Sequence, residues 1–360
     1  MKKSLAIILA VMLFCTIFTG CGNAQSETSA ADGEKPIRIA LMLNGELGDF
    51  AFFDSAANGM QMCIDEYGVD AKVFEAGFDH TNWKSTLYDL ASEGDWDLII
   101  TGTFDMLEIV EEVAKEYPDQ KFIHYDAGLD YSTGEYDNVY SVDYRYNKGS
   151  FLAGYVAAAI SETGNIGMIP AMSIPACNDF ALGYVAGARY KNPDIKVQLK
   201  YTDDFNDSAK GKELALMMYN NGADIIANGA SISGLGIFDA AKETKMLAIG
   251  SDADQSALYE TVDPEKAATI FTSVTKRIDR SLYRAVGMYL DGTLPFGSNE
   301  SLGIEDGCIE LIVNDHFKEI VPESIQKEVE DVTAKVVNNE IEIPSAYGMT
   351  IDEINAYLLG

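Results

Sequence analysis

The stretch IRIALMLNGELGDFAFFDSAANGM, residues 37–60, contains the first strand, the first turn and the first helix that the sequence predicts. Its opening seven residues are almost continuously apolar, which is typical of a β-strand covered on both faces. The turn that follows carries three phenylalanines between two aspartates: Asp49, Phe50, Phe52, Phe53 and Asp54. Burial in a core would account for one of these rings. Three rings beside two carboxylates indicate a surface that binds a flat molecule with polar edges.

The same rhythm of a short apolar strand followed by a helix repeats along the chain. A first set of strand-like runs covers residues 37–43, 71–77, 97–103, 121–127 and 138–144. A second set covers residues 165–171, 195–202, 224–230 and 246–252, and further runs follow at 267–274 and 308–314. Near-continuous apolar strands that alternate with helices indicate parallel sheets covered on both faces. Two such sets predict two doubly wound α/β domains, with residues 140–151 as the first passage between them.

Ligands of open α/β sheets bind beyond the carboxyl ends of the strands. The residues that follow the predicted strands of the first set include Asn44, Asp49, Phe52, Thr103, Phe104 and Asp126. The second set contributes Phe205, the glycines of residues 228–236 and Asp252. Each set therefore supplies an aromatic ring and a carboxylate to its own edge. Two facing edges of this kind would form an amphipathic cleft.

Seven segments lie in the order and spacing found in the basic membrane protein family of bacterial lipoproteins, the nucleoside-binding components of ABC importers. They are GDFAFFDSAANG, KGSFLAGYVAA, FALGYVAGARYKNPDIKV, YTDDFNDSAKGKELA, GADIIANGASISGLG, IGSDADQ and FTSVTKRID. The chain resembles this family over residues 37–290. The resemblance implies the type I periplasmic-binding-protein fold, with two Rossmann-like lobes joined by hinge strands. It also implies a solute-binding protein rather than an enzyme.

The resemblance gives individual residues roles in ligand binding. Phe52 and Phe205 match the aromatic residues that stack on the base, and Asp126 and Asp252 match the carboxylates that hold the ribose hydroxyls. Lys276 matches the lysine that joins them, Gly229 matches a backbone contact near the sugar, and Asp49 begins the family's turn as a polar edge. Stacking on both faces of a base contributes ~0.5–1.5 kcal/mol per ring pair beyond burial, and buried carboxylates need a nearby cation.

Two positions depart from the family pattern. Phe53 stands where relatives have asparagine, and Asn44 lies near the position where purine-binding relatives carry the aspartate that reads the base edge. The base is therefore left open, and the expected ligand is a nucleoside or nucleoside-like molecule. The residues alone also admit simpler interpretations: the phenylalanines as core, the two aspartates as turn formers, and the lysine as a surface residue. Asp54 or Ser55 is expected to cap the first helix.

The two lobes are expected to be discontinuous in sequence. The first is predicted to comprise residues 36–145 and about 277–305, and the second residues 146–272 and about 306–345. Residues 346–360 are assigned to a C-terminal tail.

The N-terminal residues indicate a targeting segment. Lys2 and Lys3 precede a largely apolar run that is too short to span a bilayer but has the length of a signal-peptide core. We predict a signal peptide at residues 1–20. The run ends in TGC, which resembles a lipobox with Cys21 as the lipidated residue; an ordinary secretory signal is the alternative. Residues 21–35 are polar and small and would form a flexible linker. The expected location is the extracytoplasmic face of the cell membrane.

Charge and composition exclude several other classes. A formal net charge of −31 disfavours nucleic acid as a partner. The scattered cysteines and histidines form no CxxC or HExxH pattern, so neither a metal site nor a cofactor is expected. The expected partners are an ABC permease and ATPase, with the chain itself a monomer. A sensory lipoprotein read by a membrane receptor, and a nucleoside-processing enzyme that uses paired carboxylates, are the alternative functions.

Overall fold

The computed structural model describes residues 35–359. The predicted signal peptide, Cys21 and all but the last residue of the predicted linker lie outside this range. Within it, none of the helices has both the length and the apolar character needed to cross a bilayer.

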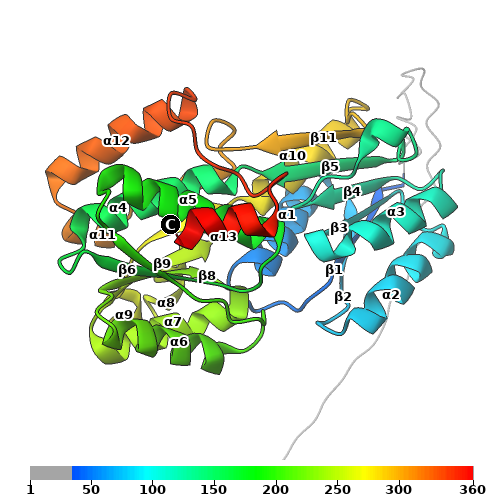
Figure 1. Cartoon of the computed structure of the whole chain (residues 1–360). Helices are drawn as coiled ribbons and strands as arrows, with labels where there is room; N and C mark the ends of the chain where they lie inside the picture. The colour runs from blue at the N-terminus through cyan, green and yellow to red at the C-terminus, as the bar shows by residue number, and fades with distance from the viewer. Residues whose placement is uncertain (1–34, 360) are drawn as a thin grey trace, which may run out of the picture. The chain divides into compact units, whose positions relative to one another are not determined.

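The first sheet has six parallel strands in the order β11-β5-β4-β3-β1-β2 (Figure 1). Their bounds are β1 Arg38–Leu43, β2 Asp70–Glu75, β3 Leu98–Gly102, β4 Phe122–Tyr125, β5 Val139–Tyr144 and β11 Ser298–Leu302. The strands predicted for the first set are confirmed. Strand β11 is not among the predicted strands, because its residues SNESL are mostly polar, as suits a strand at the edge of the sheet.

The second sheet has the order β12-β10-β9-β8-β6-β7, in which only β12 runs antiparallel to its neighbour. The bounds are β6 Asn165–Pro170, β7 Lys196–Leu199, β8 Ile225–Gly229, β9 Leu247–Asp252, β10 Ile270–Lys276 and β12 Ile309–Leu311. All of these strands coincide with predicted runs. Two doubly wound sheets with interleaved helices confirm the predicted fold class.

Helices cover both faces of each sheet because alternate strand residues point to opposite sides. In β1, Ile39 and Leu41 pack into one apolar cluster, and Ala40 and Met42 into another. The helices of the first sheet are α1 Phe52–Tyr67, α2 His80–Glu93, α3 Leu107–Glu116 and α10 Ile278–Leu290. Those of the second sheet are α4 Tyr146–Ile160, α5 Pro175–Lys191, α6 Ser208–Asn220, α7 Ser231–Thr244, α8 Gln255–Tyr259 and α9 Pro264–Ala267. The second sheet shows the same division: in β8, Ile225 and Ala227 belong to one apolar cluster and Ile226 to another.

Helices α4 and α5 approach one another closely because glycines occupy their contact. A Cβ atom at Gly187 would lie 1.8 Å from the carbonyl oxygen of Phe151, and one at Gly154 would lie 2.0 Å from that of Tyr184. Both distances are impossible for real atoms, so any larger residue would force the helices apart. This contact fixes α5, whose first turn carries part of the cavity described below.

Three further helices follow: α11 Asp315–Ile320, α12 Glu323–Val337 and α13 Ile351–Leu359. The last of these lies in the segment for which the sequence analysis assigned only a tail. It packs beside α5 and buries Ile354 and Leu358, and Arg189 of α5 donates a hydrogen bond to the carbonyl oxygen of Tyr357 (Figure 1). Two buried residues in nine are too few to predict a helix from periodicity.

The chain passes between the two sheets three times. The passages are Arg145 between β5 and α4, Arg277 between β10 and α10, and residues 303–308 between β11 and β12. They are bonded to one another: Arg145 Nη2 donates to Asp306 Oδ2, and the backbone N–H of Arg277 donates to the carbonyl oxygen of Cys308, each over 2.8 Å. The three passages therefore form one hydrogen-bonded unit.

Candidate functional site

A cavity of about 570 Å³ lies where strand ends of both sheets meet. All the predicted site residues except Asp49 line it: Asn44, Phe52, Asp126, Phe205, Gly229, Asp252 and Lys276. They come from the ends of β1, β4, β8, β9 and β10, from the start of α1 and from the loop after β7. The strand ends of the two sheets thus bring together residues that lie more than 200 positions apart in the sequence.

Several cavity residues have a backbone conformation that is unusual for residues other than glycine. The φ angles are +80° at Thr103, +69° at Asp126 and +63° at Asp252, each at the end of a strand. Such positive φ values cost on the order of 1–3 kcal/mol each and tend to cluster at ligand sites. The strain is concentrated where the cavity is, which supports a binding role for these strand ends.

The centre of the cavity wall is a buried cluster of charges. The ammonium of Lys276 lies 2.7 Å from Asp126 Oδ1 and 4.0 Å from Asp252 Oδ1. The three side chains are only 7%, 12% and 13% exposed. Asp126 follows a strand of the first sheet, whereas Lys276 and Asp252 end strands of the second. The lysine therefore joins the two sheets electrostatically.

Burial and charge set the protonation of this cluster. Burial opposes the charged form of Lys276, but the two carboxylates outweigh it and raise the pKa of the ammonium. Burial raises the pKa of Asp126, with Lys276 opposing the shift. Burial also raises the pKa of Asp252, where Lys276 opposes and Asp126 reinforces it. One cation thus faces two carboxylates, and the carboxylate farther from the lysine is the weaker partner.

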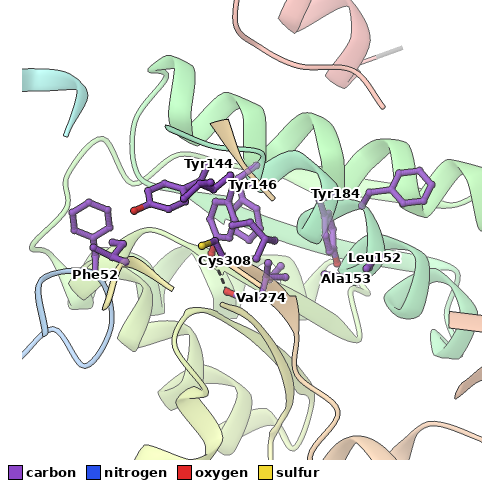
Figure 2. Close-up of a cluster of buried hydrophobic side chains, with 14 of the residues drawn as sticks. Phe52, Tyr144, Tyr146, Leu152, Ala153, Tyr184, Val274 and Cys308 are labelled. Atoms are coloured by element: carbon purple, nitrogen blue, oxygen red, sulfur yellow. Dashed lines mark hydrogen bonds between the residues drawn. The ribbon is translucent and has the colours of Figure 1, made fainter. Parts of the chain in front are cut away.

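Aromatic rings surround the ammonium. It lies 4.4 Å from the ring centre of Tyr146 and 5.3 Å from that of Phe52, within the range of cation–π attraction. Figure 2 shows Phe52 and Tyr146 in the same buried cluster. The hydroxyl of Tyr146 donates to the carbonyl oxygen of Val274 over 3.0 Å and accepts the N–H of Asp252 over 3.1 Å. These bonds fix the end of β9 beside β10.

Two acceptors in the cavity wall have no hydrogen-bond partner in the described part of the chain: Asp252 Oδ1 and Asn44 Oδ1. Asn44 already uses its amide, because Nδ2 donates to Thr103 Oγ1 over 2.7 Å. A buried acceptor without a donor costs ~1–3 kcal/mol. Donors carried by a ligand would satisfy both atoms. One acceptor lies by the charge cluster, and the other follows β1.

The rest of the wall is strongly aromatic. The ring of Phe52 meets that of Phe53 edge to face at 5.2 Å, and Phe53 meets Phe78 in the same way at 6.0 Å. Aromatic residues that the sequence analysis did not place in the site also line it: Phe78, His80, Trp83, Tyr146 and Phe180. Tyr146 could have been identified from the sequence, since it lies within residues 140–151, the predicted first passage. The others lie in the loop before α2, in α2 and in the second turn of α5, and none of them directly follows a strand end.

Asp49 has a different role from the predicted polar edge. It is fully buried, and its carboxylate accepts the backbone N–H groups of Ala51, Phe53 and Asp54 at the start of α1. Burial raises the pKa of Asp49 to about 6, with these bonds opposing the shift. Asp49 therefore holds the first turn of the helix.

The expectation that Asp54 or Ser55 caps α1 is wrong, because the helix begins earlier, at Phe52. Asp54 instead accepts the N–H groups of Gly48 and Phe50, and Ser55 Oγ accepts that of Asp279. Of the two rings left open as core residues, Phe53 is 6% exposed and Phe50 is 49% exposed.

The chain is similar to proteins of one known family. Residues 37–346 match the family model described as ABC transporter substrate-binding protein PnrA-like. The chain belongs to this family. It is 30% identical to basic membrane protein A2 of Borrelia garinii subsp. bavariensis, covering 94% of this chain and 96% of that protein. It is 26% identical to the ABC transporter nucleoside-binding protein BmpA of Lactococcus lactis subsp. cremoris, covering 96% of this chain and 100% of that protein.

A solved structure supports the same assignment. An ABC transporter solute-binding protein from Aeropyrum pernix K1 superposes with a TM-score of 0.79 at 27% identity, covering 89% of this chain and 96% of that chain. The PnrA-like family consists of substrate-binding proteins of ABC transporters and is not an enzyme family. The two sheets and their passages are the type I periplasmic-binding-protein fold. In the part of the chain that the structure describes, no group of three or more metal-ligating side chains comes together.

Proposed function

We propose that this PnrA-like protein binds a nucleoside or nucleoside-like molecule in the cavity between its two sheets and delivers it to an ABC permease and its ATPase. The observation that carries the proposal is the buried Lys276 between two aspartates, beside an aromatic wall. In this proposal the chain acts as a monomer on the extracytoplasmic face of the membrane, where a lipid on Cys21 holds it. The nucleoside-binding relative supports the ligand class.

The two ends of the cavity suit the two parts of a nucleoside. Phe52, at the start of α1 beside the first sheet, and Phe205, in the loop after β7 of the second sheet, provide apolar faces for a base. Asp126 and Asp252 accept hydrogen bonds from the ribose hydroxyls, and these bonds are charge-assisted and therefore about twice as strong as neutral ones. The unpartnered Oδ1 of Asp252 is the acceptor still free for a hydroxyl. Gly229 lines the cavity at the end of β8, where its backbone would contact the sugar.

In the proposed complex, the unpartnered Oδ1 of Asn44 accepts a hydrogen bond from the edge of the base. One N–H of the Asn44 amide is engaged by Thr103, and its carbonyl oxygen is the buried acceptor without a partner in the described part of the chain. It would favour a base that presents a donor, such as an exocyclic amino group. This preference does not by itself choose between purines and pyrimidines.

Binding is coupled to the arrangement of two lobes. The proposed first lobe comprises residues 36–145 and about 277–305, and the second residues 146–272 and about 306–345. Contacts from both lobes to one ligand stabilise the closed arrangement by their differential binding energy. The three bonded passages serve as the hinge.

The test is isothermal titration calorimetry on residues 35–360, which contain the whole compact unit that begins at Pro36. Purine and pyrimidine nucleosides, their free bases and free ribose are compared. Binding of nucleosides, with much weaker binding of bases and of ribose, is expected. If no nucleoside binds, the ligand class is wrong.

The variant Asp252→Asn sharpens this test. Loss of a charge-assisted hydrogen bond should lower the affinity for nucleosides by roughly 10- to 100-fold, because such bonds contribute ~1.5–3 kcal/mol. The affinity for free bases should stay unchanged. Asp143→Asn is the matched control, since Asp143 lies one residue before the end of β5 in the first sheet but does not line the cavity. An equal loss for nucleosides and bases would remove Asp252 from the ribose site.

A further inference from the structure

We propose that a second groove, beside the ligand cavity, is a docking site for a polypeptide segment of another protein that carries an apolar side chain flanked by lysine or arginine. The groove encloses about 370 Å³ and its apolar residues include Phe50, Leu258 and Ile312. In transport, the partner is the membrane protein that receives the ligand, so this part of the inference rests on the proposed function.

The groove is built from elements of both sheets. Phe50 comes from the turn before α1 on the first-sheet side. Leu258 lies on α8, and Ile312 directly follows β12, both on the second-sheet side. Arg277 of the second passage also lines the groove. A segment bound there contacts both sheets, and its affinity therefore depends on how the sheets are arranged.

Phe50 is held in an unfavourable conformation that leaves its ring exposed. Its φ angle is +55°, and its side chain is 49% exposed. The carboxylate of Asp54 fixes this conformation by accepting the N–H groups of Phe50 and Gly48, each over 2.9 Å. A left-handed backbone conformation at a bulky residue raises the free energy of the folded state, and a ring that stays exposed contributes little burial to offset this strain. Leu258 is also 39% exposed. Exposed aromatic and aliphatic residues in one concave site are typical of a protein-binding surface.

The charge of the groove selects the partner. The acidic residues in its wall are Asp54, Asp252, Asp254, Asp279 and Glu310, and the basic residue in its described wall is Arg277. Asp279 already neutralises Arg277, since its Oδ2 lies 2.7 Å from Arg277 Nη2. Glu310 is paired with Arg280 over 3.6 Å and Asp252 with Lys276 over 4.0 Å. Asp54 and Asp254 have no basic partner in the described part of the chain and carry the uncompensated charge. The remaining negative charge attracts a basic segment and repels an acidic one or a nucleic acid.

The groove and the ligand cavity share one residue. Asp252 lines both. Its side chain binds ribose in the proposed function, and it also contributes to the wall that the partner touches. A bound ligand and a docked segment therefore lie on two sides of one carboxylate.

Two substitutions test the groove without touching the ligand site. Phe50→Asn keeps a residue that tolerates positive φ, and Leu258→Asn removes the second exposed apolar side chain. Val262→Asn is the matched control, because Val262 is 74% exposed but does not line the groove. Thermal melting checks that all three variants fold, with shifts of less than a few degrees expected.

The first readout is fluorescence anisotropy with two labelled peptides, KKLFKK and EELFEE. The wild-type chain should bind the basic peptide and not the acidic one, and affinity should fall at least fivefold in F50N and L258N but not in V262N. This readout does not depend on the small ligand. Equal affinity of all variants for the basic peptide would overturn the docking site.

The second readout is uptake of labelled nucleoside by cells in which each variant is the only copy of the chain. Uptake should fall at least tenfold for F50N and L258N, with calorimetric nucleoside affinity unchanged within twofold. Unchanged uptake would overturn the assignment of the groove to the transport partner. If the purified wild-type chain binds no nucleoside, the proposed function fails, whereas the peptide result still decides the groove.

Discussion

The ring of Phe53 occupies the space that a side chain at Gly45 would need. A Cβ atom at Gly45 would lie 2.2 Å from the nearest ring carbon of Phe53. Phe53 is therefore a packing partner of a glycine in the turn after β1, and it supports Phe52 from the edge at 5.2 Å.

Gly45→Ala should displace the ring of Phe53 and destabilise the protein by ~1–3 kcal/mol through overpacking. Because Phe53 supports Phe52, ligand affinity should fall as well. Urea unfolding and calorimetry measure the two effects. In the double variant G45A/F53L the smaller side chain should restore part of the lost stability. If G45A melts like the wild type, the contact does not constrain the turn.

Lys276→Met should leave two buried carboxylates without their cation. Breaking a buried pair by removing one partner costs ~3–5 kcal/mol, so the variant should unfold at lower urea concentration and lose nucleoside binding. Lys84→Met provides the control: its pair with Glu112 is about half exposed on both sides, and exposed pairs contribute only ~0–1 kcal/mol.

The K276M defect should also depend on pH. Without the lysine, both aspartates keep raised pKa values, and protonation at lower pH should remove the uncompensated charge. The stability difference from wild type should therefore shrink as pH falls from 7 towards 4. A difference that is constant over this range would show that the loss comes from packing alone.

His124 should make the protein sensitive to acid. It lies in the middle of β4, fully buried, and burial lowers the pKa of its imidazole to about 3. In the unfolded chain the imidazole binds a proton near pH 6.5, whereas in the folded chain it stays neutral down to about pH 3. The stability that the neutral His124 contributes is therefore fully present above pH 6.5 and is lost as the pH falls towards 3. The loss reaches roughly 5 kcal/mol for a shift of this size.

The contribution of His124 is measured as the difference in unfolding free energy between wild type and His124→Leu from pH 7 to pH 4. The difference is needed because Asp49, whose pKa is raised to about 6, has the opposite effect on stability between pH 4 and pH 6. The advantage of the leucine variant should grow steadily on acidification. Parallel pH profiles would show that the imidazole already gains its proton in the folded state.

Asp49→Ala should destabilise α1 and have only an indirect effect on the ligand. Three backbone donors lose their acceptor, at a cost of ~1–3 kcal/mol. Asp49→Asn keeps one acceptor oxygen and should lie between the alanine variant and wild type. Both variants should bind nucleoside with little change once folded. A selective loss of affinity in a stable D49N variant would return Asp49 to the binding site.

Most strands could be predicted because each lies in a short β-rich run between polar turns, and the central strands are buried on both faces. Strand β11 lacks such a run, since its residues SNESL are mostly polar and only Leu302 at its end is buried. The helix α13 was missed for a related reason, since only Ile354 and Leu358 are buried. Elements with one contact surface and a polar remainder carry too little pattern to be seen without their neighbours.

The site was predictable where strand ends determine it. Asn44, Asp126 and Asp252 follow parallel strands, and the order of the sheets brings such ends together. Phe78 and Phe180 could not be placed in this way, because their positions depend on how a loop and a helix pack. Asp49 was misassigned because a carboxylate near a helix start suits both a cap and a ligand, and only the observed start of α1 distinguishes them.

The interleaving of the two sheets sets the order in which the protein can be completed during synthesis. The edge strand β11 pairs with β5, and α10 packs on α1, yet both come after the whole of β6 to β10. A nascent chain released up to residue 276 therefore still lacks an edge strand and a covering helix of its first sheet. Most of the polypeptide must therefore leave the ribosome before the first sheet is complete, and a gene cut between β5 and α4 would encode a first half without β11 and α10.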